Sequence, residues 1–155
     1  MRSEDKIREG ARPWLAEGEE VLAAFVARPR GWTQGVAGSM HVGAGQQAAA
    51  HAGAEAASFR LGSPMALAIT DRRLLSLSMG AQVGMGIGGG VRDLLGQAPL
   101  SAVDAIEVKR LLVGKVVTVA IRGSNFKLEV GAGANTKGMV TAFEQRHIAV
   151  GRSPS

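Results

Sequence analysis

The chain has no cysteine and no tyrosine, and aromatic residues make up only 4% of its 155 residues. Without cysteine it can form no disulfide, no thiolate metal site and no cysteine nucleophile. The scarcity of aromatic rings argues against a surface that stacks nucleic-acid bases. The first twenty residues mix charges of both signs and contain no apolar segment, so we predict no secretory signal. The predicted location is the cytoplasm, with the membrane periphery as the alternative.

The chain also has no long, strongly apolar run. Residues 31–54 carry no charge, but six glycines and several Gln and His residues keep their hydrophobicity far below that of a membrane helix. We interpret residues 31–57 as a Gly/Ala-rich insertion, with a mobile first half and a helix over 46–57. His41 and His51 lie in this insertion without a third ligand nearby, so we predict no metal site.

Glycine and positive charge are in excess. There are 22 glycines, and the formal net charge is +5. Residues 1–57 hold six Lys/Arg against seven Asp/Glu, whereas residues 58–155 hold twelve against six. This surplus suits an anionic partner such as lipid headgroups, nucleic acid or an acidic protein face, and a solvated surface explains it equally well.

Short apolar runs bounded by turn residues predict a series of strands. They are residues 20–28, 64–70, 73–79, 106–111, 116–122 and 125–130. Asp71–Arg72 and Gly123–Ser124 predict tight hairpins between neighbouring runs. Helices are predicted over residues 3–12 and over 135–150, where apolar residues recur at helical spacing and Asn135 or Thr136 can cap the first turn. The pattern indicates an antiparallel sheet closed or plugged by a terminal helix.

Three segments in order resemble the bacterial pleckstrin-homology-like domains, which are related in fold to PH and GRAM domains. They are ALAITDRRLLSLS (66–78), PLSAVDAIEVKR (99–110) and KVVTVAIRGSNFKLEV (115–130), followed by the terminal helix, while LAEGEEVLAAF (15–25) resembles the family's opening L-x-x-G-E strand. The resemblance implies a mainly β fold: a bent antiparallel sheet or barrel of about seven strands, capped by one C-terminal helix. We expect an N-terminal extension over 1–14, this domain over 15–150, and a disordered tail over 151–155.

A glycine-rich stretch, MGAQVGMGIGGGVRD (79–93), places Gly84, Gly86 and Gly89 at the spacing G-x-G-x-x-G. A phosphate loop of that pattern follows a parallel strand and opens a helix. Here the neighbours are predicted hairpins, and the only helix that could follow, over residues 91–95, is one turn long. We therefore predict a mobile hairpin loop and no cofactor. Its apolar members are candidate contacts for a partner: Met79, Met85 and Ile87.

No nucleophile, base and oxyanion donor share a supporting spacing, so we predict that the protein is not an enzyme. The expected function is a non-enzymatic binding or scaffold module that contacts proteins, including copies of itself, without a small-molecule substrate or a specific nucleic acid. The alternative is a peripheral membrane module that binds anionic lipid headgroups through basic hairpin residues. Taken one by one, those candidates are better explained as edge-strand charges that prevent aggregation; they are Arg72, Arg73, Lys109, Arg110, Lys115, Arg122 and Lys127.

Overall fold

The computed structural model describes residues 3–30, 44–62, 64–80, 90–112, 114–146 and 148–153. Its helices are α1 (Ser3–Ala11), η1 (Arg12–Trp14), α3 (Ala44–Ala56), η2 (Leu100–Ala102) and α4 (Thr136–Gln145). Its strands are β1 (Val21–Pro29), β2 (Met65–Thr70), β3 (Arg73–Met79), β4 (Val91–Pro99), β5 (Val103–Arg110), β6 (Lys115–Ile121), β7 (Ser124–Val130) and β8 (Ala149–Ser153).

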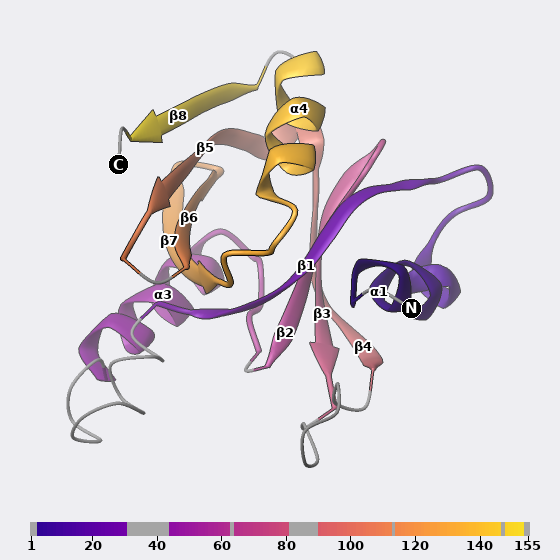
Figure 1. Ribbon diagram of the computed structural model, residues 1–155, viewed down its shortest axis with the longest axis horizontal. Coiled ribbons are helices and arrows are strands. Elements are labelled where there is room, and N and C mark those ends of the chain that lie inside the picture. Colours follow the sequence, from indigo (N-terminus) through magenta and orange to yellow (C-terminus); the bar gives the residue numbers. More distant parts are fainter. Residues whose placement is uncertain are drawn as a thin grey trace.

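The strands form one eight-stranded sheet in the order β4-β3-β2-β1-β7-β6-β5-β8. β1 lies between the two halves of this bent sheet, and α4 stands against its middle (Figure 1). Every neighbouring pair is antiparallel except β5 and β8. The predicted class, mainly β with a C-terminal helix, is confirmed. The barrel allowed as an alternative is wrong, because among the described strands β4 and β8 each pair on one side only.

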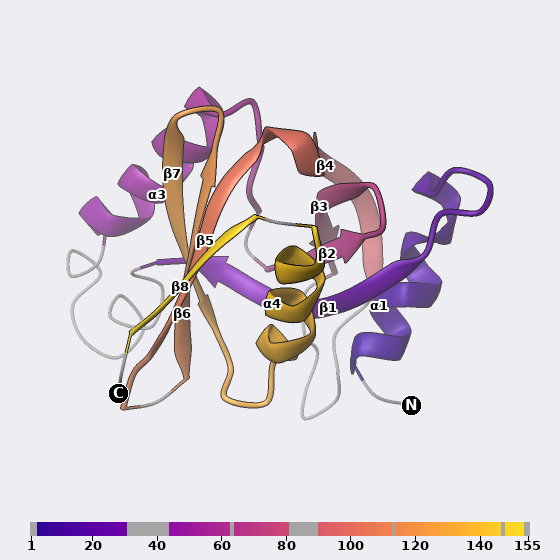
Figure 2. The same cartoon turned by 90° about the horizontal axis from the view of Figure 1, so that it is seen from above.

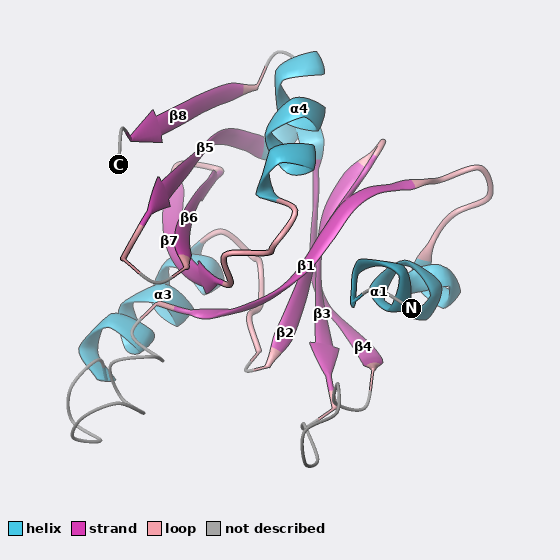
Figure 3. Cartoon of the chain, in the orientation of Figure 1, coloured by secondary structure: helices cyan, strands magenta, loops and turns pink. Residues whose placement is uncertain are grey.

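Both faces of β2, in the first half of the sheet, are buried. Met65, Leu67 and Ile69 of β2 face the main core, which α3 and α4 complete, while Ala66 and Ala68 face a second core beneath α1. Figure 3 shows the helices distributed around the sheet in this way. A strand buried on both faces needs apolar residues throughout, which explains why residues 65–69 read as a continuous apolar run without alternation.

The hairpin between β6 and β7 turns one residue earlier than predicted. Ile121 pairs with Ser124, so the two central residues of the turn are Arg122 and Gly123. Both have positive φ, 51° and 83°. This two-residue turn follows the right-handed twist of the flanking strands, and glycine adopts it at little cost.

β4 is a strand that the sequence does not predict, since residues 91–95 read as loop or a single helical turn. It pairs only with β3, and its register shifts twice along that pairing. Gly96 lies so close to Arg60 that an added Cβ would be 2.7 Å from the Arg60 nitrogen. An irregular edge strand of this kind has no clean alternation of apolar and polar residues, so the period that reveals other strands is missing.

The C-terminal region also contains a strand that the sequence does not predict. α4 ends at Gln145 and does not reach residue 150, and β8 then runs parallel to β5, where Ile106 is opposite Val150. Residues 151–153, predicted as part of a disordered tail, belong to this strand. Ile148 and Val150 pack against the main core, so their apolar character, which read as a continuation of the helix, serves a strand instead.

The helical half of the insertion is confirmed: α3 spans Ala44–Ala56 and lies along β7 (Figure 2). The end of the helix is held close to β7, because Phe59 just after the helix stacks on Phe126 of β7 with ring centroids 5.4 Å apart. The predicted mobile half of the insertion and the glycine loop of residues 81–89 lie outside the described residues.

Candidate functional site

Two of the segments on which the family resemblance rests, residues 15–25 and 66–78, contact each other. Arg73 of the TDRRL hairpin donates from Nε and Nη2 to the carboxylate of Glu19, at 3.0 and 2.6 Å, and Thr70 Oγ1 donates to the same carboxylate at 2.7 Å. The Glu19 side chain has no exposed area. The hydrogen bond from Arg73 outweighs burial and lowers the pKa of Glu19 to about 2. Arg73 therefore holds these two parts of the fold together, and its guanidinium is already bound to a carboxylate of the chain.

Six of the seven predicted basic residues divide between the two ends of the sheet. At one end, Leu100 N donates to Arg72 O and Arg122 N donates to Ala102 O, each at 3.1 Å, so both arginines lie beside η2. The Arg122 guanidinium donates to the Ala57 carbonyl at 2.9 Å and thereby fastens the end of α3. Arg72 and Arg122 thus flank one short helix and, with Arg73, form the group at this end.

The other end carries three of the predicted cations and one residue that the prediction missed. β5 runs away from η2 and ends at Arg110, which pairs with Lys115 of β6. Between them Leu112 has a relative exposure of 103%, the one exposed large hydrophobic side chain in the described ranges. Lys109 and Arg110 are exposed as well. We call Lys109, Arg110, Leu112 and Lys115 the β5–β6 tip. Lys127 lies apart from both groups, on β7 opposite Thr118.

Of the candidate contacts in the glycine-rich stretch, only Met79 is described. It is the last residue of β3, is partly buried, and packs against the second core. Met79 therefore serves the packing beneath α1, and its role toward a partner stays a prediction. Met85 and Ile87 lie outside the described residues.

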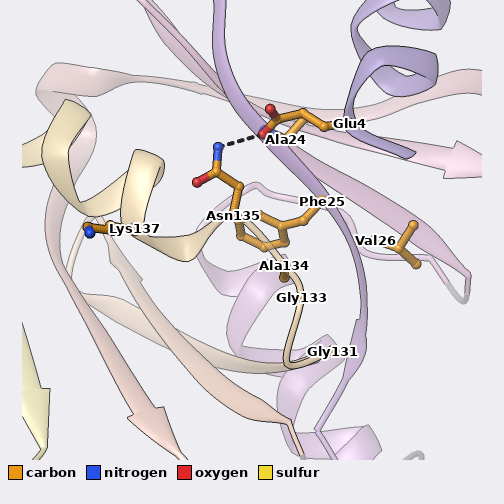
Figure 4. A pocket seen from close by; sticks show the side chains of 9 residues that line it. All are labelled: Glu4, Ala24, Phe25, Val26, Gly131, Gly133, Ala134, Asn135 and Lys137. Atoms are coloured by element: carbon orange, nitrogen blue, oxygen red, sulfur yellow. Dashed lines mark hydrogen bonds between the residues drawn. The ribbon is translucent and has the colours of Figure 1, made fainter. Parts of the chain in front are cut away.

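A groove runs beside β1, where this strand has a neighbour on one side only. β1 pairs with β2 from Val21 to Ala27, but with β7 only from Ala27 to Pro29. A depression of about 780 Å³ opens between this unpaired edge, α1 and the loop before α4 (Figure 4). A second one of about 460 Å³, also lined by Asn135 and Lys137, continues along α4. We call the two together the β1 groove; the first is lined by Glu4, Ala24, Phe25, Val26, Gly131, Gly133, Ala134, Asn135 and Lys137.

Glu4 crosses one end of the groove and joins three elements. Its Oε2 accepts from the Ala24 N–H at 3.1 Å and from Asn135 Nδ2 at 2.8 Å, and its Oε1 accepts from Arg8 at 3.2 Å (Figure 4). Burial raises the pKa of Glu4, but these three hydrogen bonds together outweigh it, so the pKa lies below its ordinary value. Arg8 also donates to the carbonyls of Val21 and Leu22. Side chains of α1 thus form hydrogen bonds with some of the main-chain groups along the open edge of β1.

Sequence reasoning missed this groove. The predicted cap at Asn135 is confirmed, since its side chain accepts from the Gly138 N–H at 2.9 Å. Nothing in the sequence indicates that Asn135 also meets Glu4, 131 residues earlier in the chain. A gap in strand pairing is a property of the tertiary structure, and only the glycines at 131 and 133 hint at an open loop.

Within the described ranges, no three His, Asp or Glu side chains gather closely enough to hold a metal ion. His41 and His147 lie outside these ranges. In the same part of the chain, no helix is both long and apolar enough to cross a bilayer.

Comparison with known proteins finds a likeness to solved structures. No protein-family model and no curated protein matches the chain. The chain is similar to the crystal structure of a DUF1696 family protein with a pleckstrin-homology domain from Shewanella loihica PV-4, with 13% identity and a TM-score of 0.47. The likeness covers 93% of this chain and 92% of the other. Similarity of this size indicates nothing about ligands or partners, so the function has to be inferred from the chain's own geometry.

Proposed function

We propose that this chain is a non-enzymatic binding module that holds an extended segment of a protein partner in the β1 groove. The observation that carries the proposal is the edge of β1 that no strand pairs before Ala27, open to a groove beside α4. Added strands bind such edges through main-chain hydrogen bonds, and neighbouring side-chain pockets provide selectivity.

The backbone geometry supports an added strand. The Ala24 N–H points to the open edge, because it donates to Glu4 of α1. Main-chain groups alternate sides along a strand, so those of Val26 point the same way. A segment that pairs with Ala24 and Val26 would form hydrogen bonds with the main-chain groups that these residues direct to the open edge. Glu4 now binds only part of these groups. Lys137 and Glu4 put one charge of each sign on the groove wall, so a partner with both charges fits best.

The non-enzymatic part of the proposal is supported by the use of the ionisable groups. The described groups with a shifted pKa are Glu4, Glu19 and Arg73. Each is hydrogen-bonded between separate elements of the fold. Shifted pKa values also mark catalytic sites, but here the shifts arise from contacts that position helices and hairpins.

Filling the groove tests the proposal. A Cβ on Gly133 would meet no atom within 4 Å, so Gly133→Trp should fold normally and place an indole in the groove. A peptide selected on the wild-type protein from a displayed random library should bind this variant more than about tenfold more weakly, equivalent to about 1.4 kcal/mol. Titration calorimetry measures the affinity, and amide exchange on the wild-type complex should show new protection at Ala24 and Val26.

Gly45→Trp is the matched control, because Gly45 on α3 has equally open surroundings away from the groove. It should leave the affinity unchanged. Equal binding by the Gly133→Trp variant would place the site elsewhere and contradict the proposal. Light scattering tests the self-association form: the wild-type protein should form a dimer that Gly133→Trp dissociates, and a strict wild-type monomer at high concentration would exclude a second copy as the partner.

A peripheral membrane function is the second candidate, and one observation favours it. Three of the seven predicted cations lie on the strand ends that flank a fully exposed leucine at the β5–β6 tip. Basic residues near an anionic lipid surface each contribute about 1 kcal/mol. The headgroup site of this candidate includes fewer cations than the sequence suggests, since the arginines beside η2 and Lys127 lie apart from the tip.

A further inference from the structure

The geometry points to the β5–β6 tip as a bilayer anchor in which Leu112 enters the acyl region while Lys109, Arg110 and Lys115 contact anionic headgroups. This inference rests on the second proposed function. It adds the site, the mode of contact and an apolar component that the basic residues alone do not imply.

The exposure of Leu112 is the first step. Large apolar side chains in the described residues are otherwise at least partly buried, so the position of Leu112 at a hairpin tip is exceptional here. The tip is held in place by its own backbone: Leu111 N donates to Gly114 O at 3.0 Å, and Gly114 has a φ of 77°. A side chain presented on a closed turn can enter another phase without unfolding any part of the sheet.

The charges beside Leu112 provide the second step. Lys109 and Arg110 are exposed at the end of β5, and among the described residues no carboxylate forms an ion pair with either. Lys115 Nζ donates to Thr136 Oγ1 at 3.0 Å, which ties the tip to the start of α4. An apolar tip with cations on the strand ends on either side of it is complementary to an anionic bilayer, where the acyl region is apolar and the headgroups are negative.

Alternative occupants fit this surface less well. A soluble polyanion would use the three cations but would leave Leu112 in water. A protein contact that buries Leu112 would need acidic groups around an apolar pocket, and nothing on the tip specifies the shape of such a pocket. The bilayer satisfies both the apolar and the charged parts at once, with no requirement for shape.

Vesicle flotation tests the anchor with the full chain. We expect the protein to float with vesicles of phosphatidylcholine and phosphatidylglycerol, and not with phosphatidylcholine alone. Leu112→Ser should weaken the partitioning by about tenfold or more, because a leucine side chain is no longer transferred from water. Lys109→Glu with Arg110→Glu should weaken it at least as much, since each cation contributes about fivefold.

The matched control is Arg92→Glu with Lys127→Glu, which changes the net charge equally at exposed positions on β4 and β7. It should float nearly as the wild type does. The chain contains no cysteine, so Leu112→Cys also provides a unique site for an environment-sensitive dye. The emission of this dye should shift to the blue on anionic vesicles, and the same label at Gly45→Cys should not respond.

Each possible result decides the inference. Absence of flotation would reject both the anchor and the second proposed function, while the peptide test of the β1 groove is unaffected. Flotation that Leu112→Ser leaves unchanged, with a solvent-exposed dye at position 112, would keep the membrane function and reject the anchor. Equal losses in the control pair, or equal binding to heparin that Leu112→Ser leaves intact, would show a general polyanion surface and also reject it.

Discussion

Glu19→Ala is expected to lower the free energy of unfolding by about 3–5 kcal/mol, because it leaves the Arg73 guanidinium partly buried without its carboxylate. The loss is large against the total of about 5–15 kcal/mol for an ordinary domain. Besides Arg73, the Thr70 hydroxyl and the Ala16 N–H lose their acceptor. Urea unfolding followed by circular dichroism measures the difference.

The control for this variant is Glu17→Ala. Glu17 is exposed and lies two residues earlier, and only its main-chain carbonyl accepts a hydrogen bond from Arg72. The alanine keeps that carbonyl, so its effect should stay within about 0.5 kcal/mol. If the two variants lose the same stability, the Glu19–Arg73 pair does not hold the hairpin as described. If Glu19→Ala does not fold at all, Glu19→Gln at lower temperature gives the same comparison.

The same carboxylate should make stability depend on acid pH. Its pKa is about 2 in the folded chain against 4.5 for an ordinary Glu. A lowered folded pKa stabilises the fold above the ordinary value, and this contribution disappears as pH falls from 4.5 toward 2. The difference corresponds to about 3 kcal/mol. Glu4 acts in the same direction. The quantity to measure is therefore the pH dependence of the unfolding free energy of the wild type minus that of Glu19→Gln. If the two do not differ below pH 4.5, the lowered pKa is not that of Glu19.

Glu19 and Arg73 also show what the sequence could predict. The L-x-x-G-E and TDRRL segments were identified separately, by resemblance, at two strand junctions. The structure makes them one contact across 54 residues, with Glu19 as the shared acceptor. Hairpins with clear turn residues, and the helical half of the insertion, were predicted because local propensity and apolar period agree with the tertiary structure there. The family resemblance implies about seven strands, one fewer than the eight in the sheet.

The misses have a common physical origin. β4 and β8 are the two edges of the sheet, and an edge strand needs only one neighbour and no regular register. Their sequences therefore lack the alternation that marks a half-buried strand. The β1 groove exists because β7 ends at Val130, opposite Ala27, and Leu112 is exceptional only through its exposure. Leu112 falls between the predicted strands 106–111 and 116–122, where nothing in the sequence shows that its side chain is exposed.

Gly53→Ala should destabilise the protein by about 1–3 kcal/mol, although alanine favours helices. A Cβ at Gly53 would lie 2.0 Å from the Asn125 carbonyl oxygen and 3.1 Å from its carbon. This oxygen belongs to β7, paired there with β6, so it cannot withdraw and α3 must move instead. Overpacking of this kind typically costs about 1–3 kcal/mol. Movement of α3 would also loosen the stacking of Phe59 on Phe126.

Gly45→Ala in the same helix should have the opposite sign. No atom lies within 4 Å of a Cβ at Gly45, so only the gain in helix propensity remains, below about 1 kcal/mol. Urea unfolding of the two variants therefore compares the same substitution in the same helix, with and without the sheet beneath it. A stabilising Gly53→Ala would mean that α3 is not seated on β7 in solution, because propensity alone would then account for both positions.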